Sequence, residues 1–185
     1  ISTGGAQYLS GPSVKDRVRG AVAFAAAAEE VAKSYDVNIA LHTDHAPKEA
    51  VEGWVKPLLE LSTERVKAGG NPLFGSHMWD GSAVPLDENL VLAEELLELS
   101  TAAKTILEIE VGVVGGEEDG VAHEINEKLY TTTGDALATA EAVGVGEKGR
   151  YILAATFGNV HGVYKPGSVK LRPEVLKEIQ EAVGA

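Results

Sequence analysis

The sequence has 185 residues, a hydrophobic fraction of 44% and a formal net charge of −12, from 28 acidic and 16 basic residues. This length is sufficient for one sizeable core and predicts a single domain. No apolar run is long enough to span a membrane, no signal-peptide pattern opens the sequence, and no Lys/Arg cluster suits nucleic acid. Cysteine is absent, which fits a cytoplasmic location and leaves His, Asp and Glu as metal ligands.

In chain order, the first residues, Ile-Ser-Thr-Gly-Gly, resemble the end of a strand followed by a loop. Apolar residues recur at helical spacing over residues 14–34, and the β-branched stretch 37–43 predicts a buried strand. Helical spacing returns over residues 50–68, where Pro57 predicts a kinked or divided helix. Residues 71–82 then predict a short strand followed by a polar turn.

The remaining pattern predicts a helix over 87–100, a strand over 104–114 and a Gly-rich acidic loop over 115–121. A helix over 135–143, a strand over 150–160 and a helix over 172–183 follow. Thr133 or Asp135 is placed to cap the helix over 135–143, and Pro173 opens the last helix. Strands that alternate with helices imply parallel pairing, so both a (β/α)8 barrel and an open doubly wound sheet fit. No GxGxxG or GxxxxGK[ST] stretch is present, which argues against a nucleotide-binding doubly wound sheet.

Unusual polar residues cluster near the carboxyl ends of the predicted strands. They occupy residues 2–5, 43–45, 77–80, 108–110 and 158–161. The carboxyl edge of a parallel sheet is where ligands bind in α/β folds, and the amino-terminal strand ends carry nothing comparable. The distribution therefore predicts an enzyme site at one edge of the sheet.

Within this set, His45 and His161 are the best candidates for metal ligands, because they lie on separate strands and no thiolate competes with them. Asp80 and Glu110, at neighbouring strand ends, strengthen that interpretation. Glu108 and Glu110 share a strand face, and adjacent carboxylates repel each other unless a cation or a proton intervenes. The alternative to a bound cation is that Glu108 and Glu110 form salt bridges inside the sheet.

Two further features suggest acid–base chemistry. Asp44 adjoins His45 and suits proton transfer near a metal-bound substrate, although an Asx turn into Ala46-Pro47 is the alternative. The loop GGEEDG is either a polar turn or a lid that carries Glu117 or Glu118 into the site.

Phosphate binding is suggested at two places. Gly162 and Lys165 follow His161 and offer a backbone N–H and an ammonium group, although most lysines simply remain solvated. Ser2, in a predicted loop with the glycines at positions 4 and 5, suits the same role.

Four segments resemble the longer subclass of the class II, metal-dependent fructose-bisphosphate aldolases. They are LHTDHAPK, SHMWDGSAVPLDENL, LEIEVGVVGGEEDGV and ATFGNVHGVYKPGSVKLRPEVL, and the resemblance covers essentially all 185 residues in order. It implies a (β/α)8 barrel that cleaves fructose 1,6-bisphosphate reversibly to dihydroxyacetone phosphate and glyceraldehyde 3-phosphate. We also expect a cytoplasmic homo-oligomer, a dimer or a tetramer, that binds neither nucleic acid nor a membrane.

The resemblance implies roles for individual residues. Asp44 matches the residue that exchanges the proton of the substrate's C4 hydroxyl, and Glu118 matches a mobile-loop acid that moves protons at the dihydroxyacetone phosphate carbon. The implied ligands are His45 and His161 for the catalytic Zn²⁺, and Asp80 and Glu110 for a second divalent metal position; the implied phosphate contacts are Ser2, Gly162 and Lys165. The resemblance also allows for a monovalent cation.

The sequence departs from the family pattern in two respects. Ala46 stands where many relatives carry a cysteine. The resemblance also implies a strand and a helix before residue 1, and two βα units after residue 185 that hold the third zinc histidine, a Gly-Gly-Ser phosphate loop and an Asn-x-Asp motif. We therefore expect this chain to hold the central βα units and to be inactive alone, because two protein ligands leave a zinc site underfilled. The alternatives are a non-catalytic half-barrel and an aldolase for another ketose bisphosphate, such as tagatose 1,6-bisphosphate.

Overall fold

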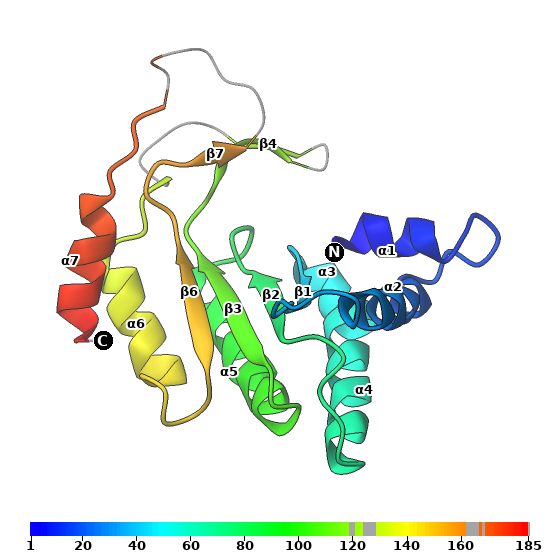
Figure 1. Ribbon diagram of the computed structural model, residues 1–185. Helices are drawn as coiled ribbons and strands as arrows, with labels where there is room; N and C mark the ends of the chain where they lie inside the picture. Colours follow the sequence, from blue (N-terminus) through cyan, green and yellow to red (C-terminus); the bar gives the residue numbers. More distant parts are fainter. Residues whose placement is uncertain (119–120, 124–128, 162–166, 168, 185) are drawn as a thin grey trace.

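The computed structural model describes residues 1–118, 121–123, 129–161, 167 and 169–184 (Figure 1). Its main sheet has four parallel strands in the order β1-β2-β3-β6. Their bounds are His42–Thr43 for β1, Ser76–Asp80 for β2, Ile106–Val111 for β3 and Tyr151–Ala155 for β6. Helices connect successive strands, so the predicted βα alternation with parallel pairing is confirmed.

A smaller sheet and a set of helices complete the described part of the chain. The small sheet has the order β5-β4-β7 and consists of β4 (Gly115–Glu118), β5 (Val121–His123) and β7 (Val160–His161). The helices are α1 (Thr3–Leu9), α2 (Arg17–Ala32), α3 (Lys48–Ala50), the π-helix η1 (Val51–Val55), α4 (Lys56–Lys67), α5 (Leu86–Ala102), α6 (Thr133–Val143) and α7 (Glu174–Val183). No helix within these residues is both long enough and apolar enough to cross a membrane.

The first residue, Ile1, lies beside β1 and is hydrogen-bonded to it and to the residue that follows β1. The Ile1 ammonium group donates a hydrogen bond to the His42 carbonyl (2.7 Å), and the Asp44 N–H donates to the Ile1 carbonyl (3.0 Å). This alternation is the pattern of a parallel ladder. The loop predicted after it is wrong, because Ser2 caps α1 by accepting a hydrogen bond from the Gly5 N–H (3.1 Å) and the helix begins at Thr3.

Three other predicted boundaries change. The strand expected over 37–43 is confined to His42 and Thr43, because Val37 and Ile39 stay more than half exposed and have no covered sheet face to pack on. The strand expected over 150–160 divides near Gly158 (φ +95°), after which β7 pairs with β4 instead of β3. The acidic loop expected over 115–121 instead begins as β4, which pairs antiparallel with β5.

Of two local predictions about helices, one is confirmed and one is corrected. The helix around Pro57 is divided, because a π-helical turn over Val51–Val55 precedes α4, where Pro57 stands near the start and needs no intrahelical donor. The predicted cap at Thr133 or Asp135 is wrong, because α6 begins at Thr133 and its N-cap is Thr132. The Thr132 Oγ1 accepts a hydrogen bond from the Asp135 N–H (3.1 Å), while Asp135 Oδ2 accepts one from the Thr132 N–H (2.9 Å), which forms a capping box.

The two faces of the main sheet have different surroundings. His77 and Trp79 of β2, and Leu107 and Ile109 of β3, are fully buried. Trp79, Leu107 and Ile109 belong to a core cluster with residues of the helices, which include Trp54, Leu58, Leu96 and Leu97. The alternate residues Asp80, Glu108 and Glu110 point to the opposite face, so β2 and β3 are largely apolar on one face and carry carboxylates on the other. A helix-covered outer face and a polar inner face are typical of a (β/α)8 barrel wall, not of a doubly wound sheet.

Candidate metal site

Three neighbouring strand ends bring His45, Asp80 and Glu110 together. β1 ends at Thr43, so His45 lies just beyond its last pairing, whereas Asp80 ends β2 and stands opposite Glu110 in β3. The Asp80 N–H donates a hydrogen bond to the Ala46 carbonyl (3.1 Å), which ties the end of β2 to the segment that carries His45. The carboxyl edge of the sheet therefore gathers side chains that are far apart in sequence.

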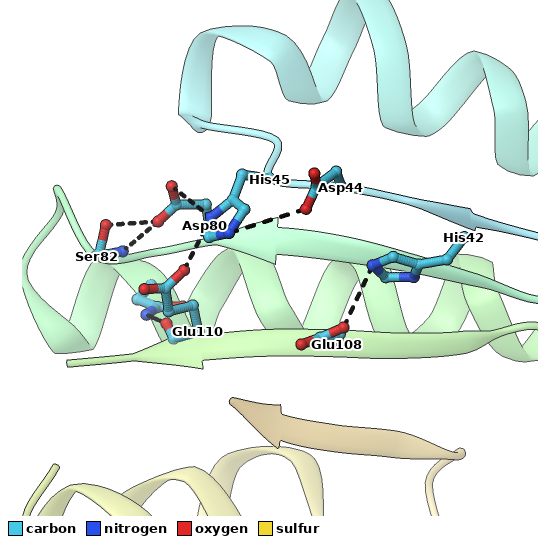
Figure 2. A network of polar contacts seen from close by, with 8 residues as sticks. His42, Asp44, His45, Asp80, Ser82, Glu108 and Glu110 are labelled. Carbon is cyan, nitrogen blue, oxygen red and sulfur yellow. Dashed lines mark hydrogen bonds and ion pairs between the residues drawn. The ribbon is translucent and has the colours of Figure 1, made fainter. Parts of the chain in front are cut away.

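The three side chains offer a set of ligand atoms for a cation. His45 Nδ1 lies 3.2 Å from Glu110 Oε2 and 3.5 Å from Asp80 Oδ2 (Figure 2). One ligand atom from each residue falls within 4.8 Å of the others. Glu110 is 2% exposed, so a carboxylate is held inside the protein next to a second one. Two carboxylates around one imidazole favour a bound positive charge.

The Asp80 carboxyl group is held in its ionised form. Burial raises its pKa, but hydrogen bonds with the His45 ring and from the Ser82 hydroxyl and N–H outweigh that effect, so the pKa lies below the usual range. The Ser82 N–H donates to Asp80 Oδ1 at 3.0 Å. An ionised carboxylate is the form that binds a metal.

His161 approaches the same cluster from a distant part of the chain. Its ring centroid lies 5.6 Å from that of His45, in an edge-to-face arrangement with an interplanar angle of 77°. Both rings and Glu110 line one cavity of about 170 Å³. The pairing of β7 with β4, which follows β3 in the chain, carries His161 to this position. The two predicted zinc histidines therefore share a cavity.

Asp44 stands beside this cavity with access to solvent. Its side chain is 52% exposed, and its Oδ1 lies 3.9 Å from His45 Nε2. Because β1 ends before Asp44, both Asp44 and His45 reach the same edge although they are adjacent in sequence. A carboxylate in this position has access to a substrate held near His45.

A second pair lies one layer deeper on the same face of the sheet. His42 Nε2 lies 3.4 Å from Glu108 Oε2 (Figure 2). His42 Nδ1 also shares a hydrogen bond with Ser76 Oγ (2.8 Å). Burial lowers the pKa of His42, although Glu108 and Asp44 act in the opposite direction. The alternative of a salt-bridged interior therefore describes Glu108, whereas Glu110 belongs to the upper cluster.

The sequence did not single out His42 or Ser82 as site residues. His42 follows the apolar end of the strand segment, where a histidine is easily taken for part of the ladder. Ser82 had a readable signal, because an aspartate two residues before a serine is typical of an Asx turn, in which the carboxylate accepts the N–H hydrogen bond.

Four predicted site residues do not join the described cluster. Ser2 lies next to β1 through Ile1, and its hydroxyl caps α1. Glu118 contributes only its backbone, in β4, to the described part of the chain. Gly162 and Lys165 fall outside the described residues. The loop acid and the phosphate contacts therefore stay predictions.

The covered parallel wall and the His–carboxylate cluster at its carboxyl edge define a (β/α)-barrel protein with a site suited to a divalent cation. The family model for class-II fructose-bisphosphate aldolase matches residues 1–185. The chain belongs to the class II fructose-bisphosphate aldolase family, and its sheet is part of the family's (β/α)8 barrel.

Individual relatives agree with this assignment. The fructose-bisphosphate aldolases of Streptomyces galbus and Mycobacterium bovis are 65% and 64% identical over 185 residues, which cover 100% of this chain and 54% of each relative. A crystal structure of the Campylobacter jejuni fructose-bisphosphate aldolase matches with a TM-score of 0.79 and 41% identity, covering 98% of this chain and 51% of that chain. The chain spans about half the length of the curated relatives it matches.

Proposed function

We propose that this chain is part of a class II aldolase that cleaves fructose 1,6-bisphosphate reversibly to dihydroxyacetone phosphate and glyceraldehyde 3-phosphate. The main support is the convergence of His45, His161, Asp80 and Glu110 at the carboxyl edge of the sheet, in a chain that matches the family throughout. The same proposal makes the whole protein a cytoplasmic homo-oligomer, a dimer or a tetramer, that acts on a sugar phosphate.

The residues present fit a zinc ion. Imidazole nitrogen and carboxylate oxygen are both zinc ligands, and the cluster combines them around a buried Glu110. We assign His45 and His161 to the catalytic ion, and Asp80 and Glu110 to a second divalent position next to His45. When bound, zinc supplies positive charge that stabilises the negative charge left next to the carbonyl when the C–C bond breaks.

Asp44 is assigned the first proton transfer. It removes the proton of the C4 hydroxyl; the oxygen's electron pair then forms the aldehyde carbonyl as the C3–C4 bond breaks, and the bonding pair stays on C3 of the dihydroxyacetone phosphate fragment. The half-exposed position of Asp44 beside His45 suits a base that must reach a substrate. Glu118 is assigned proton delivery to C3, and Ser2, Gly162 and Lys165 the phosphate contacts, from the family resemblance alone.

A hybrid enzyme tests the proposal, because the relatives are about twice as long as this chain. In the hybrid, these 185 residues replace the matching part of the Streptomyces galbus aldolase, which is 65% identical. We expect cleavage of fructose 1,6-bisphosphate in a coupled assay, abolished by EDTA and restored by Zn²⁺. A folded hybrid that cleaves nothing, or that cleaves equally well in EDTA, would contradict the proposal.

The Asp44→Ala variant of the hybrid separates the base from the metal ligands. Turnover should fall by a factor of about 10²–10⁴, the usual contribution of a positioned acid or base, while the zinc content stays nearly unchanged. The matched His45→Ala variant should lose both turnover and zinc. Undiminished turnover in Asp44→Ala would remove Asp44 from the mechanism.

A further inference from the structure

A buried asparagine on α5 connects the strand ends that carry two of the proposed metal ligands. Asn89 is 2% exposed and lies in the first turns of α5. Its Nδ2 donates a hydrogen bond to the Glu110 backbone carbonyl (2.9 Å), and its Oδ1 accepts one from Trp79 Nε1 (2.7 Å). One carboxamide thus bonds to Glu110 on β3 and to the residue before Asp80 on β2.

The orientation of this carboxamide is fixed by its partners. The Trp79 indole nitrogen can only donate and the Glu110 carbonyl can only accept, so one assignment of the amide oxygen and nitrogen satisfies both. Both hydrogen bonds are buried, which makes each unmet partner costly if the carboxamide is removed. The carboxamide therefore holds a single position relative to the two strands.

Gly81 makes room for this arrangement. A Cβ atom at Gly81, the residue after Asp80, would lie 2.0 Å from Asn89 Nδ2 and 2.1 Å from Asn89 Cγ. The carboxamide consequently packs directly over the backbone where β2 ends. Asn89 contacts the main chain next to both carboxylate ligands, while the two polar atoms of its own side chain bond to the Trp79 indole and to the Glu110 carbonyl.

We infer that Asn89 is a positioning residue for the cation site, an inference that rests on the metal site of the proposed function. By holding the Glu110 backbone at a fixed distance from the end of β2, it sets the separation of the Asp80 and Glu110 carboxylates around His45. Residues that orient metal ligands from outside the coordination sphere change metal affinity when they are replaced, without touching the ion.

The Asn89→Leu variant gives the sharpest test. Leucine has nearly the same branched shape and favours a helix, so the variant removes both hydrogen bonds with little change of volume and no new charge. Ser100→Ala is the matched control, because Ser100 is also buried on α5, away from the cluster. Each variant is made in the hybrid enzyme; its Zn²⁺ dissociation constant is measured by competition with a chromophoric chelator, and metal-free thermal midpoints are recorded alongside.

We expect Asn89→Leu to weaken zinc binding 10–100-fold and Ser100→Ala to change it less than twofold. Trp79→Phe removes the indole N–H but keeps the hydrogen bond from Asn89 to the Glu110 carbonyl, so it should also weaken zinc binding, by a smaller factor. If Asn89→Leu does not fold, the zinc affinity of Trp79→Phe tests whether Asn89 positions the metal ligands. Unchanged zinc affinity in the folded variants, with only a lower thermal midpoint, would make Asn89 merely structural. A folded parent hybrid that binds no zinc would instead overturn the proposed metal site together with this inference.

Discussion

The contact between α1 and α2 depends on a glycine, and replacing it tests how the amino-terminal segment is held. A Cβ atom at Gly20 of α2 would lie 1.7 Å from the Ala6 carbonyl oxygen and 2.7 Å from the Ala6 carbonyl carbon. Both are backbone atoms of α1, so no side-chain rotation relieves the clash. To reach 3.0 Å, below which Cβ contacts essentially do not occur, the Cβ···O separation must grow by about 1.3 Å.

The size of the effect follows from two opposing contributions. Forcing the helices apart costs about 1–3 kcal/mol, the usual range for overpacking, because Ala6, Ala21 and Ala25 are fully buried around this contact. Alanine favours the helix over glycine by about 1 kcal/mol. Because the clash at 1.7 Å is with backbone, the overpacking cost falls in the upper part of this range, about 2–3 kcal/mol. The net loss for Gly20→Ala is therefore about 1–2 kcal/mol, or about 2–8 °C in thermal midpoint for a chain of this size.

Calorimetric or circular-dichroism melting of Gly20→Ala beside Gly4→Ala measures this loss. Gly4 is also helical, but a Cβ there meets nothing within 4 Å, so Gly4→Ala should keep or raise the midpoint. Because α1 begins next to Ile1, which is hydrogen-bonded to β1, a displaced α1 should also increase hydrogen exchange at the Asp44 N–H. A Gly20→Ala protein at least as stable as the parent would refute the packing argument.

Three further changes test other parts of the structure. Burial lowers the pKa of His77 to about 3, below the value of 6.5 in the unfolded chain, so protons favour unfolding as the pH falls from 6.5 towards 3. Between pH 7 and pH 4.5, urea titrations should therefore show a smaller loss in the free energy of unfolding for His77→Gln than for the parent protein. Thr132→Ala should cost about 1 kcal/mol in the same titration at pH 7, because it removes the cap of α6, and no loss would contradict the capping box. Gly112 and Gly146 both have positive φ, but only a Cβ at Gly112 would clash, with Thr156 Oγ1 at 2.3 Å. Gly112→Ala should therefore lower the thermal midpoint more than Gly146→Ala. Equal losses in the thermal midpoint would show that backbone strain alone determines the effect.

Much of the scaffold could be predicted from local pattern. The helix expected over 87–100 coincides closely with α5, and the strand expected over 104–114 contains the shorter β3, because apolar spacing reports which side chains face a core. Parallel pairing also predicts that Asp80 and Glu110 lie at the same edge of the sheet, and the structure pairs them there. Which atoms meet there, and that Glu108 pairs with His42 instead, depends on strand register, which the sequence does not state directly.

The unpredicted features depend on contacts between distant residues. Helix α1 has two glycines and no clear apolar period, and it packs on α2 only because Gly20 leaves room for its backbone. Asn89 follows two acidic residues and looks like part of a solvated face, yet it is buried between two strands. Exposed Val37 and Ile39 show the converse, since residues with strong strand preference form no strand when no sheet face receives them.

The alternation along β2 also restricts how genes of this family can change. His77 and Trp79 face the helices while Met78 and Asp80 face the opposite side, so inserting or deleting one codon within Ser76–Asp80 would send an indole into the polar interior and a carboxylate among leucines. Divergence in this strand must therefore proceed by substitution at constant length. Changes of length are better tolerated in exposed turns such as residues 145–148, where an added residue shifts no strand register.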